Sequence, residues 1–98
     1  MNINISCIGN IMYKLQDAYT AAKILGITFD KFRPEDLLEG MNVELEHGTI
    51  NPNTNVTNDY LIPTAQIALA HLNEFPNYYN KEYGIKVFEK YLQAKLDK

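Results

Sequence analysis

Apolar and polar positions follow a helical period over the first half of the chain. From residue 13 to 25 the apolar residues fall on one stripe and the charged residues lie off it, and Gly26 follows where a helix C-terminus is expected. A second helix is predicted over residues 34–47, because proline and two acidic residues occupy its first turn and Gly48 follows its end.

The second half predicts two further helices. Residues 63–75 begin with proline and are apolar almost all round, so we expect this helix to be the buried one. Pro76 ends it, and a last helix is predicted from residue 77 or 78 to residue 95. The side chains expected on the inner side of that last helix are Tyr79, Tyr83, Val87, Tyr91 and Leu92. The pattern as a whole predicts an all-α fold, a small bundle of three to four helices around residues 63–75.

The remaining segments are an N-terminal stretch and one long loop. Residues 1–12 alternate loosely and predict an extended arm or a short strand, and residues 13–98 predict a single helical domain. Residues 49–62 are rich in Asn and Thr and predict an irregular loop. Loops of this length in a compact domain tend to be functional or to be ordered by their own side chains.

Composition excludes several classes of function. With 9 basic and 12 acidic side chains, a net charge of −3 and no Lys/Arg block, the sequence does not predict a nucleic-acid partner. No stretch predicts a membrane span or a secretory signal, so we expect a cytoplasmic protein of a bacterium or an infected host cell. The single cysteine, Cys7, excludes an internal disulfide and a cysteine-based zinc knuckle.

The most specific chemistry in the second predicted helix is a Glu-x-x-His pair. At about 100° per residue, Glu44 lies at the edge of the apolar stripe, and His47 lies roughly 60° further round on the same side. Glu46 points to the opposite face, where solvent is its expected neighbour. The pair Glu44/His47 is therefore expected to face the domain interior.

The third predicted helix carries the same residue types in reverse order. His71 and Glu74 share the side of the helix that carries Ile67, so two antiparallel helices would bring them toward Glu44 and His47. Two imidazoles and two carboxylates form a donor set suited to Zn, Fe or Mn. Glu-x-x-His is also half of the di-iron bundle motif, and a complete dinuclear site would need ligands from a second chain.

A structural alternative stays open for these four residues. A buried glutamate beside a histidine is commonly an ion pair or a hydrogen-bonded core group that holds two helices together. In that case the protein is an interaction module, a homo-oligomer or a binder of an unknown host protein. Both hypotheses use the same side chains.

Other residues give weaker indications. Tyr78 and Tyr79 invite a catalytic role, but adjacent aromatic residues at a helix start are more often packed in the core. Asp59 can ligate a cation from the long loop, although the spacing of acidic residues does not fit an EF-hand. The sequence contains no Gly-rich phosphate loop, nucleophile elbow or Cys/His dyad, which favours a non-catalytic protein.

Several motifs together resemble a known protein family. They are the stretches VELEHG (43–48), TNVT (54–57) and IALAHLNEFPNYY (67–79), within a matching region of about residues 28–80. This resembles a family of small uncharacterised proteins, a domain of unknown function, found in bacteriophages, large DNA viruses and bacteria. The family usually has Asp after the proline, where this chain has Asn77.

The resemblance implies no established activity. It does imply that Glu44, His47, His71 and Glu74 belong to the family's pattern and that the chain has a phage, viral or prophage origin. The use of Asn, Ile and Lys suits an AT-rich genome. We therefore expect a small accessory protein of phage or viral type with a Glu/His metal or polar site.

Overall fold

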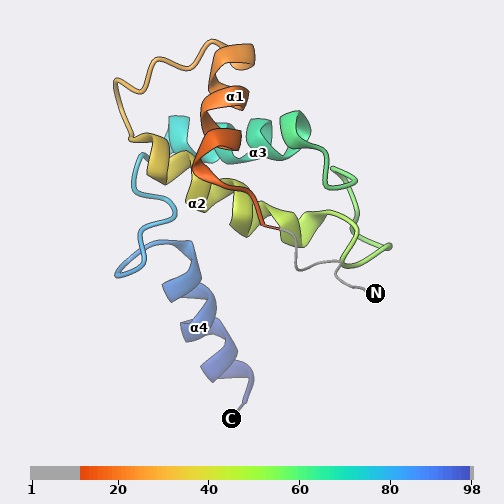
Figure 1. The fold of residues 1–98 in the computed structure, drawn as a ribbon. Helices are drawn as coiled ribbons and strands as arrows, with labels where there is room; N and C mark the ends of the chain where they lie inside the picture. Colours follow the sequence, from red (N-terminus) through yellow and green to blue (C-terminus); the bar gives the residue numbers. More distant parts are fainter. Residues whose placement is uncertain (1–11, 98) are drawn as a thin grey trace.

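A computed structural model describes residues 12–97, and this range contains four α-helices and no strand (Figure 1). The elements are α1 (Leu15–Leu25), α2 (Pro34–Glu44), the short 3-10 helix η2 (Leu45–His47), α3 (Leu61–Glu74) and α4 (Ile85–Leu96). The predicted all-α class is therefore confirmed. The arm or strand predicted for residues 1–12 lies, apart from Met12, outside the described residues.

Local side chains fix the ends of the first two helices. Asp17 accepts a hydrogen bond from the backbone N–H of Lys14 at 2.8 Å, and Asp36 accepts one from the N–H of Arg33 at the same distance. Each carboxylate satisfies an orphan donor at a helix N-terminus and interacts favourably with the helix dipole. At the other end of α1, Gly26 has φ 73°, the left-handed conformation that ends helices and that glycine adopts without strain.

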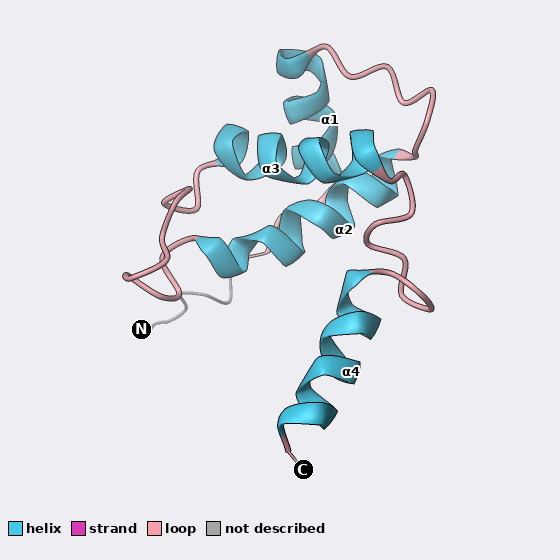
Figure 2. Ribbon diagram, turned by 180° about the vertical axis from the view of Figure 1, so that it is seen from behind, coloured by secondary structure: helices cyan, strands magenta, loops and turns pink. Residues whose placement is uncertain are grey.

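The core lies between α1, α2 and α3. Helices α2 and α3 pack against each other and run in opposite directions in both ribbon views, while α1 crosses them (Figures 1 and 2). Three alanines of α1 and two of α3 are fully or almost fully buried and allow the helices to approach closely. The buried apolar residues are Ala18, Ala21, Ala22, Phe32, Leu37, Met41, Ala65, Ala68, Leu72 and Tyr79.

Helix α3 differs from the prediction in two respects. It begins at Leu61, so that Pro63 is its third residue rather than its first. Proline is tolerated there because the first-turn N–H groups have no partner within the helix. The helix packs against both neighbours, yet Gln66, Ala70 and Asn73 are exposed, so it is not buried all round.

The predicted start of the last helix is wrong. Residues 75–84 form turns, and α4 begins only at Ile85. The Asn80 side chain accepts hydrogen bonds from the N–H groups of Glu82 and Tyr83, which stabilises a turn in competition with a helix. Of the side chains predicted on its inner side only Tyr79 is buried, and it lies in these turns; α4 itself leaves the bundle (Figure 2) and has no buried residue.

The loop between η2 and α3 is ordered by hydrogen bonds of its own. Asp59 accepts hydrogen bonds from the N–H of Thr49 at 2.9 Å and from its hydroxyl at 2.5 Å. The hydroxyl of Tyr13 donates to the backbone carbonyl of Asp59 at 2.6 Å. The loop is therefore closed on itself and attached to Tyr13, which lies two residues before the start of α1.

Candidate functional site

Glu44 is a buried carboxylate at the end of α2. The buried positions of this helix are Leu37, Gly40, Met41 and Glu44, so the glutamate continues the stripe that faces the core. Only 4% of Glu44 is exposed. Its Oε2 accepts a hydrogen bond of 2.5 Å from the hydroxyl of Tyr79. A buried carboxylate needs such partners, since leaving its charge unpaired away from water is costly.

Both histidines of the chain lie beside this carboxylate. His47 Nε2 is 3.7 Å from Glu44 Oε1, and His71 Nε2 is 3.8 Å from Glu44 Oε2. Both distances exceed the roughly 3.2 Å limit of an ordinary N–H···O hydrogen bond. The two side chains are 47% and 35% exposed, so the group opens to solvent on the histidine side. We call Glu44, His47, His71 and Tyr79 the Glu44 cluster.

The fourth predicted member, Glu74, is not brought into this cluster. It is the last residue of α3 and is exposed, and no ion pair joins it to another residue in the range 12–97. His71 faces α2, and Glu74 lies about 60° round the helix from it. The structure thus brings together three of the four residues in the predicted metal set and leaves Glu74 in solvent.

Two tyrosines hold His71 in place. Its ring stacks on Tyr78 with centroids 4.2 Å apart and planes 7° apart, and Tyr79 lies edge-on to Tyr78 at 5.0 Å. Burial raises the pKa of Tyr79, and the hydrogen bond to Glu44 raises it further. Burial also raises the pKa of Tyr78, with a smaller contribution from the charge of Glu44. Both phenols therefore remain protonated at neutral pH, and Tyr79 acts as a donor.

Two residues near the cluster were missed by the sequence analysis. Glu46, which the α-helical period places in solvent, has its Oε1 3.8 Å from His47 Nε2. Its Oε2 accepts a hydrogen bond of 2.7 Å from Lys86 of α4. The α-helical angle does not apply because residues 45–47 form a 3-10 helix with about 120° per residue, so Glu46 is not directly opposite Glu44. No local sequence signal identifies Lys86 as the partner, since 40 positions separate the two residues.

Asp59 lies outside the cluster. Both of its carboxylate oxygens accept hydrogen bonds from Thr49, and its backbone carbonyl accepts the Tyr13 hydroxyl. Through these hydrogen bonds, Asp59 closes the loop. As the side chains stand, no group of three or more His, Cys, Asp or Glu residues within 12–97 has the geometry of a bound metal.

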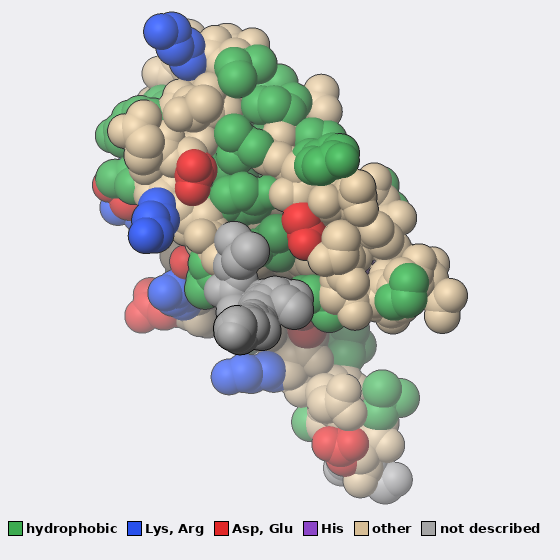
Figure 3. All heavy atoms as spheres, turned by 45° about the vertical axis from the view of Figure 1, so that its right-hand side comes forward, with side chains coloured by type: hydrophobic (Ala, Val, Ile, Leu, Met, Phe, Trp, Pro, Cys, Tyr) green, Lys and Arg blue, Asp and Glu red, His purple; other side chains and the backbone are tan. Residues whose placement is uncertain are grey.

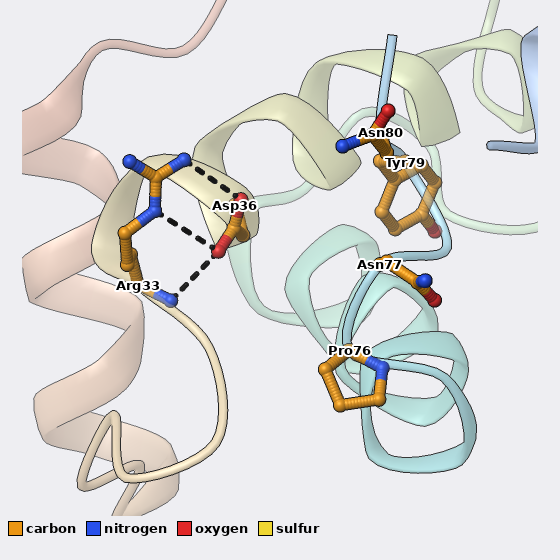
Figure 4. A pocket seen from close by; sticks show the side chains of 6 residues that line it. All are labelled: Arg33, Asp36, Pro76, Asn77, Tyr79 and Asn80. Carbon is orange, nitrogen blue, oxygen red and sulfur yellow. Dashed lines mark hydrogen bonds and ion pairs between the residues drawn. The ribbon is translucent and has the colours of Figure 1, made fainter. Parts of the chain in front are cut away.

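A pocket of about 420 Å³ has Tyr79 in its lining. Its lining comes from the start of α2 and from the turns after α3, and Figure 4 shows the Tyr79 ring in its wall while Arg33 and Asp36 face each other. The Arg33 guanidinium is bound to Asp36 at 3.3 Å. The charges that line this pocket are thus already paired.

The outer surface has no single-sign patch on the face drawn in Figure 3, where basic and acidic side chains are interspersed. Among the described helices, none combines the length and the apolar character needed to cross a bilayer.

One comparison identifies a family. A family model described as "Protein of unknown function (DUF5661)" matches residues 18–90. The chain belongs to the DUF5661 family. The DUF5661 match is longer than the region of resemblance at residues 28–80, and it includes most of α1 and the first half of α4. The whole Glu44 cluster lies within it. Comparisons with curated proteins and with solved structures find no match.

Proposed function

We propose that this DUF5661 protein is a small, non-catalytic accessory protein that binds a divalent transition metal through Glu44, His47 and His71. The observation that carries the proposal is the position of two imidazole Nε2 atoms 3.7 and 3.8 Å from one buried carboxylate. Two nitrogen donors and one carboxylate form a set that binds Zn, Fe or Mn.

Both distances are longer than a direct hydrogen bond and somewhat longer than the spacing of donor atoms around a bound metal. Around a tetrahedral ion with bonds of about 2.0–2.1 Å, neighbouring donor atoms lie about 3.4 Å apart. The observed separations of 3.7 and 3.8 Å exceed this by a few tenths of an ångström. His47 is half-exposed and belongs to the short η2, and the proposal requires its side chain to move toward Glu44 when a metal binds.

Residues around the three ligands suit the same role. Tyr79 donates to Glu44 and would orient the carboxylate, as outer-shell groups do in metal sites. Glu46 lies 3.8 Å from His47 Nε2 and offers a fourth ligand if Lys86 releases it. Positive charge from a metal would also compensate the buried carboxylate of Glu44.

Metal analysis tests the proposal. Protein purified without chelator is assayed for bound metal, and the metal-free chain is titrated with Zn²⁺, Mn²⁺ and Fe²⁺ by calorimetry. We expect one ion per chain and an affinity at least about 10-fold lower after His71→Ala or His47→Ala. Glu74→Gln is the matched control, because Glu74 is a carboxylate on the same helix as His71 but outside the cluster. No micromolar binding, or equal losses in the control, would contradict the proposal.

A second candidate is a protein-interaction module in which the Glu44 cluster is structural. The Tyr79 hydrogen bond to Glu44 and the Tyr78 stack on His71 attach residues 75–84 to α2 and α3. In this case the purified protein is metal-free, and His71→Ala lowers the melting temperature while leaving no metal affinity to change. The partner is then a second copy of the chain or a host protein.

The phage, viral or prophage origin and the cytoplasmic location of a bacterial or infected host cell also remain proposals. They are supported by the resemblance in the stretches 43–48, 54–57 and 67–79 and by the Asn, Ile and Lys usage of the chain. A gene located among virion or lysis genes would support the origin, whereas a chromosomal location among housekeeping genes would contradict it.

A further inference from the structure

Helix α4 exposes its large apolar side chains. At about 100° per residue, its bulky apolar residues fall within one arc, and Lys86 and Lys90 lie on the opposite side. The exposed fractions are 61% for Phe88, 60% for Tyr91, 59% for Leu92 and 78% for Leu96. The helix extends away from α1–α3 in both ribbon views (Figures 1 and 2), so none of these helices covers the arc.

The apolar surface continues from α4 onto the turns that precede it. Phe75 and Tyr83 are 54% and 55% exposed. Together with Tyr78, Ile85 and Phe88 they line an open hollow of about 240 Å³. We call the exposed set the α4 patch, and its members are Phe75, Tyr83, Phe88, Tyr91, Leu92 and Leu96.

We propose that the α4 patch is a homodimer interface in which the α4 helices of two copies pack antiparallel. In the second candidate function, the protein-interaction module, the partner would then be a second copy of this chain. The interface does not depend on metal binding, because no ligand in the Glu44 cluster belongs to the patch.

The area of the patch fits a dimer. Large apolar side chains bury roughly 150–250 Å² each when fully covered, so six of them at the observed exposures present roughly 600 Å² per chain. Two copies would then bury roughly 1,200 Å², which exceeds the roughly 1,000 Å² expected of a specific interface. A single patch of this size is at the upper end of what monomeric proteins expose.

The arrangement of residues along α4 is self-complementary. In an antiparallel pair, Phe88 lies opposite the partner's Leu92, and the partner's Leu96 reaches the hollow beside Ile85. The same contacts form twice, as a two-fold axis requires. Asp97 then lies beside the first turn of the partner's α4, where the helix dipole favours negative charge. Lys95 is the one charged residue within the apolar arc, and depletion of charge is typical of an interface centre.

The oligomeric state of the full chain tests this proposal. Sedimentation equilibrium from about 1 μM to 1 mM should give a mass that rises from that of the 11.2 kDa chain to twice that value. Leu92→Glu should raise the dimer dissociation constant at least about 100-fold, because each dimer loses two buried leucines and gains two buried charges. Gln93→Glu is the matched control, since it adds the same charge on the polar side of α4 and should leave the constant within about 3-fold.

Two results would overturn the interface. One is a chain that stays monomeric up to about 1 mM, and the other is a dimer that Leu92→Glu does not weaken. Far-UV circular dichroism of Leu92→Glu tests whether the variant retains its helices. Phe88→Gln provides a second, uncharged change in the same patch. Because metal titration is measured separately, a monomer that binds Zn²⁺ refutes this interface and leaves the metal proposal standing.

Discussion

Removing the hydroxyl of Tyr79 gives the most direct test of the Glu44 cluster. Tyr79→Phe keeps the ring, which packs against Gly40, and deletes only the donor to Glu44 Oε2. The carboxylate is 4% exposed, so solvent replaces the lost hydrogen bond poorly. Hydrogen bonds to charged groups contribute about 1.5–3 kcal/mol to stability. We expect the free energy of unfolding to fall by about 2 kcal/mol.

Thermal unfolding at pH 7 in the presence of a chelator measures this change. For a domain of this size, about 2 kcal/mol corresponds to a melting temperature lower by roughly 8–16 °C. Tyr83→Phe is the control, because Tyr83 is 55% exposed and should change stability by less than about 0.5 kcal/mol. If Tyr79→Phe also costs less than about 0.5 kcal/mol, Glu44 does not depend on the phenol and the assignment of Tyr79 as its orienting donor is refuted.

Three further predictions concern the surroundings of the cluster. Gly40→Ala should destabilise the fold by about 1–3 kcal/mol despite the better helix propensity of alanine, because its Cβ would lie 2.5 Å from the Tyr79 ring; a higher melting temperature would contradict this. Because folding raises the pKa of Tyr79, its ionisation does not change stability below pH 10.0, the ordinary pKa of a tyrosine. There the phenol is protonated in both the folded and the unfolded chain. Above that pH the phenol ionises first in the unfolded chain, so the free energy of unfolding should fall with pH by about 1.4 kcal/mol per unit more steeply than in Tyr79→Phe. Equal pH slopes for the two proteins, measured by denaturant unfolding, would refute this prediction. Thr49→Val should increase amide hydrogen exchange in the loop closed by Asp59, and unchanged exchange would contradict its role there.

The sequence predicted those parts of the fold that depend on local periodicity. The core-facing stripe of α2 includes Leu37, Met41 and Glu44 at helical spacing, and this pattern alone indicated that Glu44 points inward. The same argument placed His71 on the face of α3 that meets α2. Gly26 ended α1 as predicted, because a left-handed residue at this position favours glycine.

The sequence could not predict features that depend on contacts between distant residues or on irregular backbone. The turns at 75–84 arise from Asn80 side-chain bonds and from the backbone N–H of Ile85, which donates to the carbonyl of Tyr78. A helical period continues through this stretch, so the pattern predicted a helix. Likewise, the 3-10 geometry of residues 45–47 and the contact of Glu46 with Lys86 depend on tertiary packing.

Charge compensation at Glu44 connects the two candidate functions. The carboxylate is buried, and the Tyr79 hydroxyl reduces its desolvation cost without neutralising its charge. Under the metal proposal, a cation bound on the histidine side of the cluster would compensate this charge. Under the two proposals the same carboxylate would bind a metal in one case and only connect α2 to residues 75–84 in the other, where it accepts the hydrogen bond of Tyr79.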